Sequence, residues 1–179
     1  ALMGAEGDVA GLQTLLAESR DDIAPLERLG EIGGAEAAAA LSQHVEHRTA
    51  GFRAEVARAL GGTGAAVAAH AALGTLLSDT EMPVVAAALL AVGRLGDHEH
   101  ESAIVHWLGS EDNEVFSAAC VAATQLELER ARPLLRAAIV ARDIPSQRRR
   151  RPVLIALQTL ADASLLPDLI EIARRLETS

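Results

Sequence analysis

The segment from Asp97 to Glu101 holds the densest group of side chains that can ligate a metal ion. Two histidines, His98 and His100, alternate there with the carboxylates of Asp97, Glu99 and Glu101. In an extended segment, alternate residues point to one side and could chelate a single ion. This segment instead falls on a predicted turn and helix start, where acidic residues complement the helix dipole. We therefore interpret it as a solvated turn and assign no metal ligand to it.

Other residues with chemical potential are few. His44 and His47 are three apart in a predicted helix, a spacing that can bring two imidazoles to one ion, but the nearby third ligand is only a carboxylate. Cys120 falls in an apolar helical pattern, as an inert core thiol does. All 16 basic residues are arginine, which excludes a lysine Schiff base and a P-loop. We predict no catalytic residue, no metal and no cofactor.

Arginine is concentrated in the last third of the chain. Residues 128–152 contain eight arginines and two acids, a net charge of +6, whereas residues 1–127 contain six arginines and nineteen acids, a net charge of −13. Two interpretations stay open: a solvated helix start, or a site for an acidic protein segment, a phosphate group or nucleic acid. Nucleic acid is the least favoured, because no aromatic residues are interleaved. The arginines predicted to bind are Arg132, Arg136, Arg148, Arg149, Arg150 and Arg151.

Helices must position all of these residues. Half of the residues are hydrophobic but only 2% are aromatic, with no tyrosine, so an Ala- and Leu-rich helical core is expected. Apolar residues between Pro83 and Leu95 fall at three- and four-residue steps, and Gly96 suits a helix exit. Beyond it, Ile104 and Leu108 lie one helical turn apart. Residues 81–110 are therefore predicted to form a helical hairpin.

The hairpin recurs along the chain. The apolar residues five before each turn are 31, 32, 31 and 34 residues apart, namely Leu29, Leu60, Val92, Ala123 and Leu157. A period of this length with two helices per unit is typical of a stacked helical array. We predict one domain over residues 1–179, an all-α right-handed superhelix. It comprises a partial repeat at 1–20 and hairpins at about 21–50, 51–80, 81–111, 112–143 and 144–177.

Segments 56–77 and 89–108 resemble bacterial HEAT-like repeats of the type first noted in phycobilisome lyases. In that family an alanine-rich first helix ends in Leu-Gly-Asp, as residues 95–97 do here, and proline often opens the second helix, as Pro133 and Pro167 would. The resemblance implies a HEAT-like solenoid over about residues 21–177. The fourth repeat departs from the pattern, with Glu127 and Leu128 in place of Gly-Asp.

The resemblance also extends to enzymes. HEAT-like di-iron hydroxylases acting on a modified lysine depend on repeated His-Glu pairs, and the pair His98-Glu99 lies at a turn, so this activity is disfavoured. HEAT-like DNA glycosylases use aromatic residues on a basic concave surface, which fits poorly with one tryptophan and an acidic front half. A phycobilin-lyase-like or tetrapyrrole-handling role, implied by the repeat type alone, is kept as the alternative function.

Second helices line the concave side of HEAT-like solenoids, which draws attention to His106 and Trp107. Small residues flank them on this ridge, and a lone tryptophan can anchor a partner. Trp107 could equally fill space between repeats. We include both residues in the predicted binding surface.

The predicted function is a non-catalytic protein-binding scaffold or adaptor domain of a larger protein, and not an enzyme. Its expected partner is another protein carrying an acidic segment, with self-association through the oppositely charged ends as a further option. No apolar stretch approaches the roughly 20 residues needed to cross a bilayer, so no membrane contact is expected. A cytoplasmic location is expected, because the single cysteine and the absence of a visible export signal are compatible with it.

Overall fold

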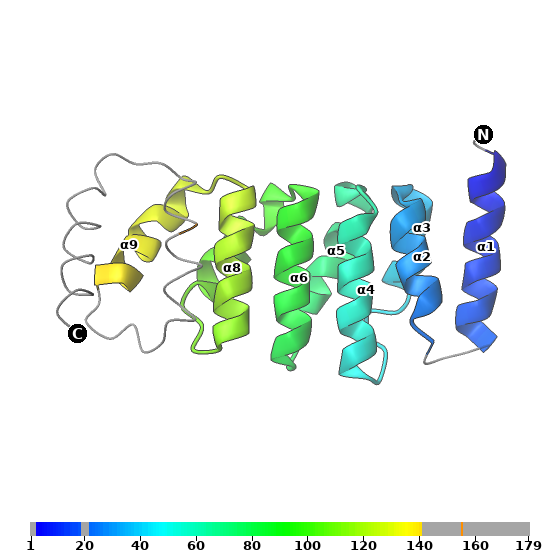
Figure 1. Cartoon of the computed structure of the whole chain (residues 1–179), viewed down its shortest axis with the longest axis horizontal. Coiled ribbons are helices and arrows are strands. Elements are labelled where there is room, and N and C mark those ends of the chain that lie inside the picture. The colour runs from blue at the N-terminus through cyan, green and yellow to red at the C-terminus, as the bar shows by residue number, and fades with distance from the viewer. Residues whose placement is uncertain (1–2, 19–21, 141–154, 156–179) are drawn as a thin grey trace.

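The computed structural model describes residues 3–18, 22–140 and 155, and all its regular structure in these residues is helical (Figure 1). This confirms the predicted fold class, an all-α HEAT-like solenoid. A single helix is followed by helical hairpins stacked side by side. The elements are α1 (Met3–Glu18), α2 (Ala24–Ile32), α3 (Gly34–Ser42), α4 (Ala50–Gly62), α5 (Ala66–Leu77), α6 (Met82–Leu95), η1 (His98–His100), α7 (Glu101–Trp107), α8 (Asn113–Gln125), η2 (Glu129–Ala131) and α9 (Arg132–Val140).

The first helices of the hairpins form one layer, in which α4, α6 and α8 stand side by side (Figure 1). Each contact in this layer places a glycine of one helix against the backbone of the next. A Cβ atom on Gly61 would lie 2.9 Å from the Cα of Ala91, a distance that real Cβ atoms essentially never show. The same arrangement recurs through the layer, as Gly30 against Ala59, Gly61 against Ala91, and Gly93 against Ala122. Glycine therefore sets the spacing of consecutive repeats.

The core lies between this layer and the second helices. It is built from leucine, alanine and valine, as the composition predicts. Among the described residues, the largest fully buried side chains come from both helices of the hairpins: Leu26, Leu29, Leu41, Leu60, Leu73, Leu76, Leu89, Ile104 and Leu135.

The turns after α6 and α8 close in the same way, although the second lacks the Gly-Asp pair. Gly96 ends α6 in the left-handed conformation (φ 70°, ψ 31°), and the Asp97 N–H donates to the Val92 carbonyl at 3.2 Å. In the fourth repeat, Glu127 adopts a φ of 50°, and the next residue donates to the Ala123 carbonyl at 2.9 Å. The two turns thus share one hydrogen bond, although Glu127 carries a side chain where the earlier turn has glycine.

Some local predictions need correction. The helix predicted to carry His44 and His47 ends before them, at Ser42. The fifth predicted repeat lies outside the described residues, so the full division into repeats stays a prediction. No helix in the described part of the chain is long and apolar enough to cross a membrane.

Candidate metal site and adjoining groove

Three potential metal ligands from two consecutive repeats meet between α5 and the turn after α6. His70 lies on α5, Asp97 follows α6, and His100 ends the short helix η1. Asp97 Oδ2 is 2.9 Å from His70 Nδ1 and 3.5 Å from His100 Nε2. One potential ligand atom from each residue lies within 4.8 Å of the others. We call His70, Asp97 and His100 the ligand triad.

The turn after α6 determines how the triad is arranged. Asp97 Oδ1 accepts the Glu99 N–H at 3.1 Å and so caps η1, which leaves Oδ2 for the two histidines. The tight η1 turn directs His100 back over α5. Its ring stacks on that of His70, with centroids 4.2 Å apart, and its Nε2 is 3.1 Å from the His70 carbonyl oxygen. Asp97 is only 7% exposed, so its charge depends on these partners.

The electrostatics of the triad favour a cation. The hydrogen bond from His70 to the Asp97 carboxylate raises the pKa of His70 above its ordinary value, and the negative charges of Asp97 and Glu99 add to this effect against the opposing effect of burial. Glu99 lies near the other nitrogen of the same ring, with Oε2 3.5 Å from Nε2. A metal ion binds neutral imidazole and must therefore displace this proton, so affinity for an ion rises with pH.

The donor set fits a transition metal ion. With bonds of about 2.1 Å, neighbouring ligand atoms stand about 3.0 Å apart in octahedral and about 3.4 Å apart in tetrahedral coordination. The two distances from Asp97 Oδ2, 2.9 and 3.5 Å, are close to these values. The two imidazole rings stack with an interplanar angle of 18°, so they must turn for both nitrogens to bind one ion. Two imidazoles and one carboxylate are ligands of non-haem iron(II) and of catalytic zinc, and such sites keep positions open for substrate.

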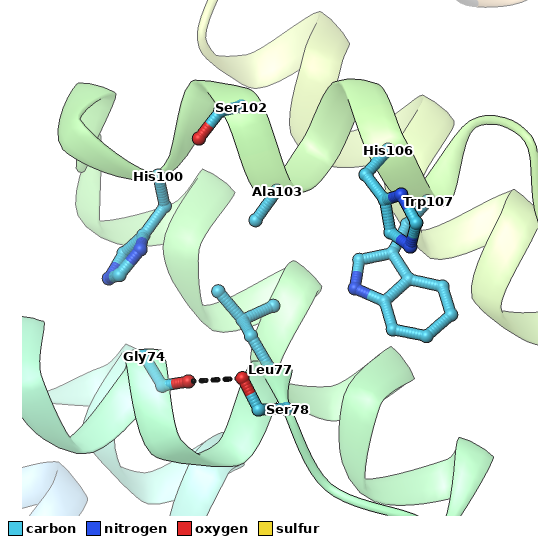
Figure 2. Close-up of a pocket in the computed structure, with 8 residues that line it drawn as sticks. All are labelled: Gly74, Leu77, Ser78, His100, Ser102, Ala103, His106 and Trp107. Carbon is cyan, nitrogen blue, oxygen red and sulfur yellow. Dashed lines mark hydrogen bonds between the residues drawn. The ribbon is translucent and has the colours of Figure 1, made fainter.

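An open groove of about 450 Å³ adjoins the triad, and His100 belongs to both (Figure 2). One wall comes from α5 and its C-terminal end, and the other from η1 and α7. Trp107 stands at the far end from His100, with the His106 ring against its edge at 5.1 Å. The lining residues are Gly74, Leu77, Ser78, His100, Ser102, Ala103, His106 and Trp107. A ligand in this groove would lie beside the triad.

The predicted binding residues are only partly brought together. His106 and Trp107 share the groove, but nothing yet tests whether they bind a partner. Arg132 begins α9 and pairs with Glu129 at 3.6 Å. Arg136 lies on α9 with its side chain outside the described part, and residues 148–151 lie outside it altogether. The arginine surface and its acidic partner stay predictions.

The histidine groups singled out from the sequence are arranged differently from the expectation. His98 turns away from the triad and pairs with Glu101 at 2.9 Å, so alternate residues do not chelate together. His44 and His47 lie in the turn after α3 rather than on one helix, and the His47 ring stacks on Phe52 with centroids 4.0 Å apart.

Sequence reasoning missed His70. The signal was the repeat period, because Asp97 and His100 follow His70 by 27 and 30 residues, nearly one repeat, which places them at the same level of adjacent hairpins. The chain has a second His-Glu pair, His100-Glu101, beside His98-Glu99, and His100 of this second pair belongs to the triad.

Fold and site together define a HEAT-like repeat protein with a potential metal site beside an open groove. No known protein family and no curated protein sequence matches the chain. Among solved structures, it is similar to human deoxyhypusine hydroxylase in complex with glycerol, with 24% identity and a TM-score of 0.60. The match covers 89% of this chain and 65% of that enzyme. This likeness supports the HEAT-like class, but neither the phycobilisome-lyase type nor a bacterial origin.

These findings correct the functional prediction. A non-catalytic scaffold that is not an enzyme is contradicted by the ligand triad and by the similarity to an enzyme of known structure. The prediction was wrong because Asp97 and His100 were considered only with their neighbours in sequence, and His70 of the preceding repeat was left out. The lyase-like or tetrapyrrole-handling alternative has no support from these findings and is withdrawn with it.

Proposed function

We propose that this protein is a metal-dependent enzyme that holds one divalent ion on the ligand triad and acts on a substrate bound in the adjoining groove. A single observation carries the proposal: two imidazoles and a 7% exposed carboxylate converge at the edge of an open groove. Sites with open metal positions in a concave surface are typical of catalysis rather than of structural metal binding.

The other repeats support a functional reason for the triad. In the other repeats that the structure describes, the positions equivalent to Asp97 are Gly34, Ala65 and Leu128, and the fifth predicted repeat has Asp162 there. The positions of His100 are taken by alanine, namely Ala37, Ala68 and Ala131. The solenoid therefore stacks without these polar groups. Burying a carboxylate is costly, and here the Glu99 N–H and the two histidines offset that cost. The same two histidines are the ligands that an ion would share with Asp97.

The reaction class we propose is hydroxylation with iron(II). Two histidines and one carboxylate are the ligands of non-haem iron(II) oxygenases, in which the ion supplies dioxygen activation. The similar solved structure is named a hydroxylase, which agrees with this class. In this chain, the triad would hold the ion, while Leu77 and Trp107 would bind the substrate and exclude water. Deoxyhypusine itself is not proposed as the substrate, since the two His-Glu pairs here share one short turn.

Metal binding tests the proposal directly. The protein purified without oxygen should take up one equivalent of Fe²⁺, measured by calorimetry and by elemental analysis after gel filtration. Asp97→Asn keeps the shape of the side chain and removes its charge, so it should weaken binding at least about tenfold. His98→Ala is the matched control, because His98 is exposed and lies outside the triad. Equal loss in both variants, or no retained ion in the unaltered protein, would contradict the site.

The reaction class has its own test. With Fe²⁺ bound, the protein should consume dioxygen when a substrate and an external two-electron reductant such as ascorbate are present, because hydroxylation places one oxygen atom in the substrate and reduces the other to water. His70→Ala should abolish this consumption. Retention of Zn²⁺ in preference to Fe²⁺, without oxygen consumption, would leave the metal site in place and overturn the hydroxylase class in favour of metal-assisted hydrolysis.

A further inference from the structure

Gly74 lies in the interior of α5, and its lack of a side chain leaves space next to the ring of His100. A Cβ atom at this position would meet His100 Cε1 at 3.4 Å and no other atom within 4 Å outside its own helix and chain neighbours. Glycine in a helix interior is less favourable than alanine, because it loses more conformational freedom on folding. The helix itself therefore gains nothing from Gly74.

Two other glycines inside helices have a different role from Gly74. Gly30 and Gly61 face the backbone of the next first helix at 2.9 Å, so each is required for packing between repeats. Gly74 faces only an imidazole. One repeat earlier or later, its position is taken by Gln43, His106 or Ala137, so the second helices stack without glycine there.

We propose that Gly74 is a positioning residue for the metal site: it leaves the space in which the His100 ring stacks on His70, and it keeps the groove open up to the triad. Gly74 and His100 both line the groove, on opposite walls (Figure 2). A Cβ atom alone would make an ordinary van der Waals contact with the ring, whereas a side chain larger than a methyl group at position 74 would displace the ring and separate the ion from a bound substrate. This inference rests on the proposed function, since it assumes that His100 is a ligand.

A graded pair of substitutions tests the proposal, with Co²⁺ as the probe because its visible spectrum reports coordination. Gly74→Ala should leave the melting temperature unchanged or raised and Co²⁺ affinity nearly unchanged, because its methyl group fits against the ring. Gly74→Leu places a larger side chain against His100 and should weaken Co²⁺ binding by about tenfold or more. The Co²⁺ spectrum of Gly74→Leu should shift, because the angle of one imidazole ligand changes.

Two controls separate positioning from general effects on helices. Gly11→Ala, in α1 with no atom within 4 Å of the added Cβ, should raise stability without changing Co²⁺ affinity. Thr75→Leu, on the exposed face of α5, should also leave affinity unchanged. Unchanged affinity in Gly74→Leu would overturn the proposal. A fall in both melting temperature and affinity in Gly74→Ala would also overturn it, because Gly74 would then be a packing residue. Failure of the unaltered protein to bind Co²⁺ would instead contradict the metal site itself.

Discussion

The two helix layers of this solenoid use their contacts for different purposes. In the first layer, α4 and α6 approach until glycine meets backbone. In the second layer, α5 and α7 are separated by an open groove, and polar side chains join the repeats at one end of it. Gly61 and Gly74 show the difference, since one admits a helix and the other an imidazole. The first layer fixes the repeat spacing, which leaves the second free to carry chemistry.

The largest loss of stability is expected from a substitution that forces the helices of the first layer apart. Gly61→Ala places a Cβ atom 2.9 Å from both Cα and Cβ of Ala91, so α4 and α6 must move apart. Overpacking of this kind costs about 1–3 kcal/mol, which urea unfolding followed by circular dichroism would measure. Gly51→Ala is the matched control in the same helix, because its added Cβ meets no atom within 4 Å and should not destabilise. Equal stability of the two variants would show that the layer can relax around the added methyl group.

The next effect concerns an ion pair that joins repeats beyond the glycine contacts. Arg53 at the start of α4 donates to Asp79 in the loop before α6, at 2.6 and 2.8 Å, and their side chains are 14% and 10% exposed. Asp79→Asn removes the charge from this two-pronged contact, so we expect a loss of about 2 kcal/mol in urea unfolding.

The same pair predicts a pH dependence with a definite sign. Hydrogen bonding from Arg53 lowers the pKa of Asp79 from its ordinary value of 3.8. A lowered pKa in the folded state contributes stability above the unfolded value and loses it as pH falls through the folded one. The difference in stability between the unaltered protein and Asp79→Asn should therefore be constant near neutrality and shrink below about pH 4. A constant difference down to pH 2 would contradict the role of the charge.

The contact between His70 and Asp97 in the second layer can be tested without any metal ion, by measuring the pKa of His70. Its pKa is raised first of all by the hydrogen bond to Asp97, so Asp97→Asn should return it towards the ordinary value of 6.5. A raised pKa in the folded state contributes stability below the unfolded value and loses it as pH rises through the folded one. Nuclear magnetic resonance titration of the imidazole would measure the shift, with Glu101→Gln as a control near the turn. An unchanged His70 titration in Asp97→Asn would remove the geometric basis of the triad.

The contrast between the layers also explains what the sequence could predict. Repeating Leu-Gly or Val-Gly pairs and the Gly96 turn carry the fold, because each repeat meets the same constraints in the first layer. The site depends on one contact between different repeats, made by His70 and His100, and the apolar period does not reveal which polar side chains meet. The sequence pattern therefore singled out Asp97 and His100 as potential ligands, but the prediction made from it was a solvated turn. Only the register of α5 against η1 joins them to His70.

The smallest expected effect concerns the turn that keeps the first layer in register. Glu127 adopts φ 50° and forms the turn that Gly96 forms one repeat earlier with φ 70°. The left-handed conformation costs a residue with a Cβ atom about 1–2 kcal/mol, a cost that glycine avoids. Glycine is also more flexible in the unfolded chain, which offsets part of this gain. Glu127→Gly should therefore stabilise the protein by about 0.5–1 kcal/mol. Glu127→Ala removes the same carboxylate but keeps the strain, so it should not stabilise. Equal gains in both variants would indicate relief of charge repulsion in place of backbone strain, and the two turns would then differ more than their shared hydrogen bond suggests.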